Sequence, residues 1–183
     1  MSMKRLVWVL MATAALVCAQ GKQTGSGQNV ELTVYLLSGS TQGTADDVPS
    51  DLSATVTQLH SVFAYKSYKL TESFMLRGRA GNAPARTEGI LPGGGDISYE
   101  FRYSSVEVSG ESPRMFRING LRIMLTKNSP LRRAPDGKKI PETLASIQTD
   151  LDIREGQKTV VGKSSVSSTG DALILVIVPK IVE

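Results

Sequence analysis

The feature that most constrains the fold is an unbroken apolar run near the C-terminus, from Leu173 to Val178. Strands of this kind are buried on both faces, whereas a half-exposed strand alternates apolar and polar residues. The run therefore predicts a central strand that other parts of the chain must cover on each side. With 183 residues, the chain is long enough for one domain with a sizeable core.

The segment that precedes this run predicts a half-buried strand and a tight turn. From Ile147 to Ile153, apolar and polar residues alternate with a period of two, which places the apolar ones on one face. Glu155-Gly156 then predicts a turn, because glycine adopts positive φ without steric cost. Lys158 to Gly162 is expected to form a second, short strand.

Further strands are predicted where the same alternation recurs, at 30–37, 65–77, 85–91 and 97–103. The second of these is expected to place four large apolar side chains on one face, with Glu72 as the exception: Tyr68, Leu70, Phe74 and Leu76. The third is weak. The last carries an aromatic stripe, which is interpreted as sheet core, with a ligand platform as the alternative: Tyr99, Phe101 and Tyr103.

The segment from Arg114 to Leu125 changes phase in its middle. Phe116 and Ile118 occupy even positions, whereas the apolar residues after Asn119-Gly120 occupy odd ones. Such a slip marks either a two-residue hairpin or a β-bulge within one strand. Because the flanking runs are short, a bulge in one long strand is favoured. Val106 and Val108 are expected to extend the pairing of the preceding strand.

One helix is predicted, from Asp51 to Phe63. Its apolar residues fall on one narrow stripe at helical spacing, which suits a helix lying on a sheet: Leu52, Val56, Leu59 and Phe63. Ser50 or Asp51 is expected to cap its start. The fold class is therefore α+β, mostly antiparallel β-sheet, either secretin-core-like or a sandwich, with one short helix near the N-terminus.

The N-terminus has the pattern of a signal peptide at 1–19, followed by a flexible linker at 20–29 and a single β-rich domain at 30–183. A basic start precedes an apolar run from Leu6 to Cys18, and Val17 and Ala19 fit cleavage after Ala19. Cys18 raises the alternative of lipid attachment, although Val17 is larger than the residue that usually precedes a lipidated cysteine. The expected location is periplasmic or extracellular.

Charge argues against nucleic acid as a partner. Loss of Lys4 and Arg5 with the signal peptide leaves 19 basic residues against 17 acidic ones, so a net charge of +4 falls to +2. Phosphate binding needs a concentrated basic face. The basic, proline-containing segment 127–141 is interpreted as a solvated loop, with docking to an acidic partner as the alternative. No run after the N-terminus reaches transmembrane length.

No catalytic, cofactor-binding or metal-binding residues are predicted, and no cofactor is expected. His60 is the one histidine, and the mature chain would contain no cysteine, so a site built from these ligands is excluded by count. Asp46, Asp47 and Asp51 do not match a calcium-loop spacing and are interpreted as an acidic loop before the helix. His60 is interpreted as a surface or boundary residue.

The segment from Gly156 to Ser164 superficially resembles a phosphate-binding loop. That loop has four residues between its glycines and is followed by a helix, whereas here there are five, and the middle reads as a strand. Nucleotide binding is therefore not predicted.

Two C-terminal motifs resemble the core domain of bacterial secretins, the ring-forming outer-membrane channels of secretion and pilus systems. The stretch from Thr149 to Lys163 is similar to the family's T-x-V-x-V-x-D/E-G-Q-T-V-V-x-G-G strand pair, and Leu173 to Val182 is similar to its closing strand L-x-I-x-I-x-P-R-I-V. The sequence departs from the family in two respects. Lys163 replaces the second glycine, and only Ser164 to Asp171 stands where secretins have a membrane-crossing hairpin region.

The resemblance implies an exported, non-enzymatic cell-envelope protein with a structural or protein–protein interaction role, through self-association or a protein partner. A β-sandwich carrier of a small ligand or lipid is the alternative, with the aromatic stripe lining its cavity. An enzyme that uses scattered acidic residues is a third hypothesis. In any of these, Arg77, Arg79 and Arg86 could form an anion site, although a solvated strand edge is the simpler interpretation.

Overall fold

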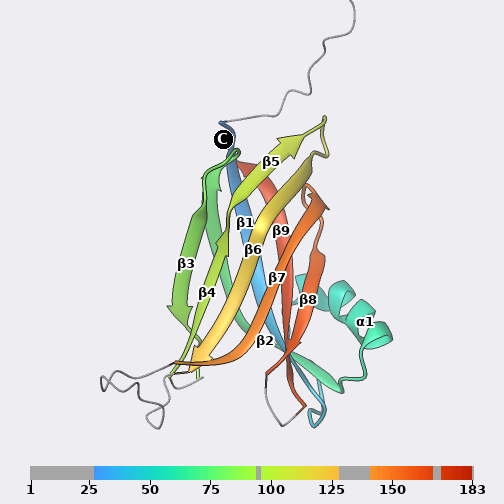
Figure 1. The fold of residues 1–183 in the computed structure, drawn as a ribbon. Helices are drawn as coiled ribbons and strands as arrows, with labels where there is room; N and C mark the ends of the chain where they lie inside the picture. Colours follow the sequence, from blue (N-terminus) through green and yellow to red (C-terminus); the bar gives the residue numbers. More distant parts are fainter. Residues whose placement is uncertain (1–26, 94–95, 128–140, 167–169, 183) are drawn as a thin grey trace, which may run out of the picture.

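A computed structural model describes residues 27–93, 96–127, 141–166 and 170–182. It consists of antiparallel strands in two sheets, with one short helix (Figure 1). The elements are, in order, β1 (Asn29–Ser40), the 3-10 turn η1 (Ser50–Leu52), α1 (Ser53–Val62), β2 (Ser67–Arg79), β3 (Ala85–Ile90), β4 (Ile97–Tyr103), β5 (Ser105–Ser109), β6 (Met115–Lys127), β7 (Glu142–Arg154), β8 (Thr159–Ser165) and β9 (Ala172–Val182). The mostly antiparallel α+β architecture with one short helix is confirmed.

The first and last strands of the domain lie side by side. Sheet A has the strand order β2-β1-β9-β8, so its two central strands come from opposite ends of the described chain. In sheet B, β6 pairs with β4 and β5 along one edge and with β7 along the other, and β3 adds to β4. β4 and β5 follow one another along β6, so Val106 and Val108 extend the pairing as predicted.

Strand β9 is central in sheet A and buried on both faces, as its unbroken apolar run predicts. Leu173, Leu175 and Ile177 belong to the core between the two sheets. Ile174 and Val176 belong to a second apolar cluster on the opposite face. One strand therefore contributes to both cores, because successive side chains point to opposite faces.

The core between the sheets gathers apolar side chains from strands far apart in the sequence. Sheet A supplies Leu32 and Val34 from β1 together with the inward residues of β9. Sheet B supplies aromatic and branched side chains that are almost fully buried, among them Phe101, Tyr103, Phe116, Ile118, Leu121 and Ile123. The alternating residues of β7 point the same way, since Ile147 and Ile153 are buried as predicted.

Helix α1 covers the outer face of sheet A. Three residues of the predicted stripe are almost fully buried, Leu52, Val56 and Leu59, and Phe63 packs against them. The predicted cap is wrong, because neither Ser50 nor Asp51 caps the helix through its side chain. The chain enters through the 3-10 turn instead.

The single apolar face predicted for 65–77 is also wrong. Tyr68 and Leu70 pack in the cluster under α1, whereas Phe74 and Leu76 pack in the core between the sheets. The β1–β2 register shifts after Leu36, which marks a β-bulge in this part of β2. One extra residue reverses the direction of the side chains that follow, so each half of the strand serves a different core.

Strand β6 confirms the predicted bulge. It runs without interruption through Asn119-Gly120, and its register with β7 shifts between Ile118 and Leu121. Gly120 has a φ of 62°, a conformation that glycine adopts without strain. A Cβ there would also collide with the Ser104 side chain. The bulge restores the inward direction of Leu121 and the residues that follow it.

The predicted turn at Glu155-Gly156 carries the chain from sheet B to sheet A. Gly156 has a φ of 72°, and its N–H donates to the carbonyl of Pro179 at 2.8 Å. The Glu155 carboxylate accepts from the N–H groups of Arg114 and Ile181, at 3.4 and 3.3 Å, and so contacts both sheets. β7 and β8 consequently belong to different sheets although a tight turn joins them.

The signal peptide and most of the linker predicted at 1–29, and the basic segment 128–140, lie outside the described residues. Within the part of the chain that is described, no helix has the length and apolarity needed to span a membrane.

Candidate interaction surfaces

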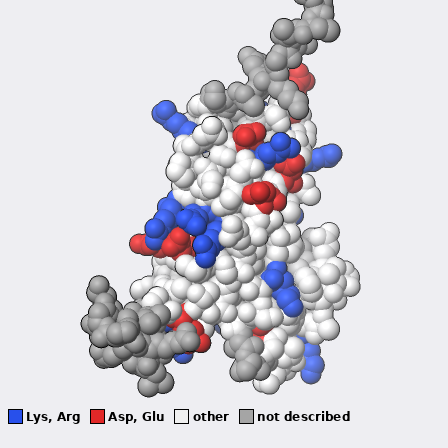
Figure 2. Space-filling model, in the orientation of Figure 1, with Lys and Arg blue, Asp and Glu red and all other residues white. Residues whose placement is uncertain are grey.

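The outer face of sheet B carries a row of arginines. Arg86 on β3, Arg102 on β4 and Arg122 on β6 are direct register neighbours across three adjacent strands. Figure 2 shows basic side chains gathered beside acidic ones on this face. Arg86 forms ion pairs with Glu88 at 2.9 Å and with Glu100 at 3.0 Å.

The structure does not bring together the three arginines proposed as an anion site. Arg77 and Arg79 lie on β2 of sheet A, whereas Arg86 lies on β3 of sheet B. Arg77 donates to the carboxylate of Glu31 at 2.7 Å, and Glu31 itself is 8% exposed. Only Arg86 belongs to the arginine row.

A hollow of about 350 Å³ lies beside the arginine row. Its lining comes from β3, β4 and β6: Glu88, Gly89, Ile90, Ser98, Tyr99, Glu100, Met124 and Thr126. Ile90 is 71% exposed, so the hollow has an apolar rim as well as two carboxylates. It is large enough for a small ligand.

Strand β2 presents an open edge. It pairs with β1 on one side, and among the described residues its other side is met only at its start, where Asp47 forms a bridge with Lys69. Beyond Leu70, whose N–H donates to the Asp47 carbonyl at 2.9 Å, residues 71–79 have no strand hydrogen-bonded to this side in the described part of the chain. Unpaired edges of this kind are templates for another strand.

The orientation of the backbone at this edge follows from Ser73. Its N–H donates to the side chain of Glu72 at 2.8 Å and is therefore directed away from β1. Alternate residues of a strand direct their N–H groups to the same side, so the N–H groups of Met75 and Arg77 also face the open edge. The Met75 side chain is 60% exposed.

The three acidic residues considered for a cation have separate partners. Asp46 contacts His60, Asp47 pairs with Lys69 at 3.6 Å, and Asp51 accepts from the Tyr35 hydroxyl at 3.3 Å. No group of three or more His, Cys, Asp or Glu side chains suited to a metal ion occurs within the described ranges. The geometry of this loop serves to hold α1 against sheet A.

His60 lies in the last turn of α1, partly exposed, and contacts the carboxylate of Asp46, which is distant from it in the sequence. Its Nε2 is 2.9 Å from the Asp46 carboxylate, and its ring meets that of Tyr68 edge-on at 4.8 Å. Asp46 also accepts from the Tyr68 N–H at 2.8 Å. Partial burial raises the pKa of Asp46, but the hydrogen bonds from His60 and Tyr68 outweigh it and hold that pKa below its ordinary value.

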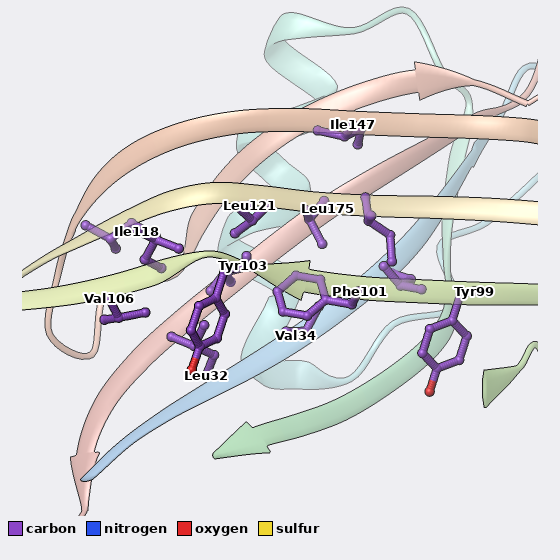
Figure 3. Packing of buried hydrophobic residues seen from close by; sticks show 14 of the residues in the cluster. Leu32, Val34, Tyr99, Phe101, Tyr103, Val106, Ile118, Leu121, Ile147 and Leu175 are labelled. Atoms are coloured by element: carbon purple, nitrogen blue, oxygen red, sulfur yellow. The ribbon is translucent and has the colours of Figure 1, made fainter. Parts of the chain in front are cut away.

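The aromatic stripe of β4 is confirmed as sheet core. Figure 3 shows Tyr99, Phe101 and Tyr103 side by side, with Leu32 and Val34 close by. Tyr99 stacks on Phe74 of β2 at 4.9 Å between ring centres. Burial raises the pKa of Tyr99, as does the nearby Glu72. The stripe fills the space between the sheets, and only Tyr99 reaches the hollow beside the arginine row.

Sequence reasoning missed Arg102 and Arg122. Both lie at outward positions of strands whose inward residues were identified, so the period of two already placed each arginine on a solvent face. What the sequence does not contain is the register that makes them neighbours of one another and of Arg86. That register depends on the pairing of strands that are not all consecutive.

No family model matches the sequence, and no curated protein matches it. Two solved structures match by fold comparison. One is the secretin InvG of the Salmonella SPI-1 type III secretion injectisome, with 12% identity, a TM-score of 0.41, and coverage of 86% of this chain and 65% of that one. The other is InvG in an atomic model of the basal body proteins InvG, PrgH and PrgK, with the same identity, TM-score and coverage of this chain, and 46% coverage of that chain.

The chain thus spans less than two thirds of each InvG chain that it matches. Likeness at this TM-score does not by itself establish a shared fold or role.

Proposed function

We propose that this chain is an exported, non-enzymatic cell-envelope protein whose secretin-like β-domain binds another protein by strand addition at the open edge of β2. One observation carries the proposal: residues 71–79 of this long strand are hydrogen-bonded to a strand on one side only within the described chain. Strand addition uses backbone hydrogen bonds for affinity and side-chain contacts for specificity.

The C-terminal motifs support the secretin-like part of the proposal. Thr149 to Lys163 spans the end of β7, the crossing turn and β8, and Leu173 to Val182 lies within β9. The two motifs thus meet in sheet A, where β8 pairs with β9. The first motif also joins that sheet to sheet B. Both motifs thus help to build the two sheets, and neither of them pairs with β2.

The charges along the edge favour a different protein over a second copy as the partner. Arg77 and Arg79 are exposed on β2, and basic side chains at an edge discourage pairing between like strands. An extended segment with acidic side chains would complement them. A defined dimer in size-exclusion chromatography with light scattering would instead favour self-pairing.

Substitution of Met75 tests strand addition directly. Because its N–H faces the open edge, Met75→Pro leaves the β1–β2 ladder intact and removes one docking hydrogen bond. Met75→Ala removes the side chain but keeps the N–H and serves as the matched control. A photo-crosslinker at position 73 is expected to capture a partner in cells. The crosslinked product should still form in Met75→Ala and should disappear in Met75→Pro.

Two outcomes would count against strand addition. The first is an unchanged crosslink in Met75→Pro, with circular dichroism showing a normal fold. The second is equal loss in both variants, which would assign binding to the side chain. A crosslinker at the exposed position 117 on sheet B controls for nonspecific capture.

Export and processing have their own test. We infer cleavage after Ala19 and a periplasmic or extracellular location, which N-terminal sequencing of the protein from fractionated cells checks. A mature chain that starts at Gln20 supports the assignment. A blocked, lipid-bearing Cys18 would support the lipoprotein alternative, and an intact Met1 in the cytosol would contradict export.

A small-ligand carrier is the second candidate, and the hollow between β3, β4 and β6 favours it. Its volume of about 350 Å³ and its lining by Ile90, Tyr99 and Met124 suit a small, partly apolar molecule. Native mass spectrometry of the purified protein distinguishes the two candidates. A co-purified small molecule lost in Met124→Glu would support the carrier.

A further inference from the structure

The arginine row on sheet B is electrostatically unfavourable unless something compensates it. Arg86 and Arg102 are direct cross-strand neighbours, as are Arg102 and Arg122. Like charges placed directly opposite one another destabilise a sheet. Adjacent strands are about 4.8 Å apart, so the three side chains start within about 10 Å. Water and salt screen part of this repulsion, and acidic groups of the protein or of a ligand can offset the rest.

Acidic side chains of the protein pair closely with only one end of the arginine row, among the described residues. Glu88 and Glu100 both pair closely with Arg86, at 2.9 and 3.0 Å. Arg102 reaches Glu100 only at 3.8 Å. Three cations thus face two carboxylates, and both carboxylates lie next to Arg86.

Arg122 is the least satisfied member of the row. Among the described residues, the one hydrogen-bond partner of its terminal Nη2 is the sulfur of Met124, at 3.5 Å, and sulfur is a weak acceptor. Its Nε is buried and has no hydrogen-bond partner within the described structure. Buried polar groups are normally paired, so the Arg122 guanidinium has unused hydrogen-bonding capacity. The Nε itself is enclosed, so an external acceptor would meet the terminal nitrogens of this half-buried side chain.

The donors continue onto the next strand. Gln148 of β7 is the register neighbour of Arg122, and its side chain is exposed. Arg102, Arg122 and Gln148 therefore form a line of donors across three adjacent strands. A chain with several carboxylates can meet such a line at successive points, whereas a single small anion meets only one of them.

We propose that Arg102, Arg122 and Gln148 bind the carboxylates of an acidic peptide segment laid across the outer face of sheet B. The planar guanidinium fork matches carboxylate geometry with two parallel hydrogen bonds. The hollow beside the row adds an apolar rim at Ile90 for a neighbouring side chain of the peptide. This surface is separate from the β2 edge, which belongs to sheet A, so either assignment can fail without the other.

A charge-matched pair of double variants tests the proposal. Arg102→Gln/Arg122→Gln removes two positive charges at the row. Lys66→Gln/Lys180→Gln removes two exposed positive charges at sheet A, neither of them on the open stretch 71–79 of β2. The probe is a fluorescein-labelled oligoglutamate peptide, followed by fluorescence anisotropy at low salt on the full chain. We expect at least about a tenfold loss of affinity for the first variant and less than about twofold for the second.

Stability provides an independent readout. If the row serves binding, Arg102→Gln/Arg122→Gln relieves like-charge repulsion and leaves the melting temperature unchanged or raised. If the row is structural, the same variant melts lower. Arg122→Lys keeps the charge but removes the planar fork, and it is expected to bind the peptide with intermediate affinity.

Four results would overturn the proposal. The first is that the wild-type protein binds no peptide at low salt. The second is that the two double variants lose affinity equally, which would indicate only a general charge effect. Competition by inorganic phosphate at the same concentration of charge would assign the row to a small anion. Preference for phosphatidylglycerol vesicles over the peptide would assign it to a membrane surface.

Discussion

The two faces of sheet A are covered in different ways. Its inner face packs against sheet B, with buried side chains contributed by β4, β5, β6 and β7. Its outer face packs against α1 and the segments next to it, and the buried members of this smaller cluster come from residues 37–68 and from β9. The inner core is thus assembled from distant strands, and the outer cluster mainly from one continuous segment.

This difference predicts unequal cooperativity. The inner core depends on ladders between strands far apart in sequence, so it should open only when the whole domain unfolds. The outer cluster can separate when a single helix lifts from the sheet. Its attachment depends on a few contacts, such as those of Asp46 with His60 and Tyr68.

Truncation on either face of β9 is expected to give the largest effect. Leu175→Ala removes a fully buried side chain between the two sheets and should lower the free energy of unfolding by roughly 4 kcal/mol. Ile174→Ala, its neighbour under the helix, should cost roughly 2 to 3 kcal/mol, because the helix can move to fill the space. Urea denaturation followed by circular dichroism measures both, and equal or reversed losses would contradict the comparison.

Leu59→Ala should weaken the outer cluster alone. Leu59 is 3% exposed, and we expect a loss of roughly 2 kcal/mol in the free energy that holds α1 on the sheet. Hydrogen exchange should accelerate for amides of residues 53–62 while those of β9 remain protected. Parallel acceleration in β9 would mean that the two clusters open together.

Acid should loosen the outer cluster through Asp46. Its pKa is lowered in the folded state, so its ionised form contributes stability above its ordinary pKa, and that contribution is lost as pH falls through the folded value. Asp46→Asn should lower the free energy of unfolding by about 1 kcal/mol at neutral pH. The variant should also lose less of that free energy than the wild type when the pH is lowered. Urea unfolding between about pH 6 and pH 2 measures this.

Asp152 supplies the control for that experiment. A hydrogen bond from Arg117 lowers its pKa too, but the pair lies on the solvent face of sheet B, where water screens it. Asp152→Asn should therefore change the pH profile less than Asp46→Asn. A larger change at Asp152 would refute the role assigned to the Asp46 contacts.

Lys163→Ala should give the smallest effect. The Lys163 ammonium donates to the Tyr65 hydroxyl at 2.9 Å and lies 5.7 Å from the ring centre of Phe63. Loss of these exposed contacts at the rim of the outer cluster should cost about 0.5 kcal/mol. Thermal unfolding compared with Lys180→Ala measures it, and identical melting temperatures would show that the rim does not strengthen the helix attachment.

The two bulges show how far local pattern reaches. In β6 the phase slip occurs at Asn119-Gly120, and glycine marks a position of positive φ, so the bulge could be predicted. In β2 the residues around the slip are ordinary strand residues, and apolar residues stand at even positions on both sides of it. The sequence pattern of β2 is consistent with a single apolar face. Only the packing shows that its two halves direct their apolar side chains to opposite faces of sheet A.

The sequence by itself determined where most strands lie and that β9 is buried on both faces, and it favoured core for the aromatic stripe, because alternation and unbroken apolar runs are local patterns of a strand. The tertiary structure decided that β1 lies beside β9 and that the turn at Gly156 joins two sheets. It also brought Asp46 to His60 and Arg102 to Arg122. These neighbours depend on which strands and loops pack together across the whole chain, and a period of two carries no information about that choice.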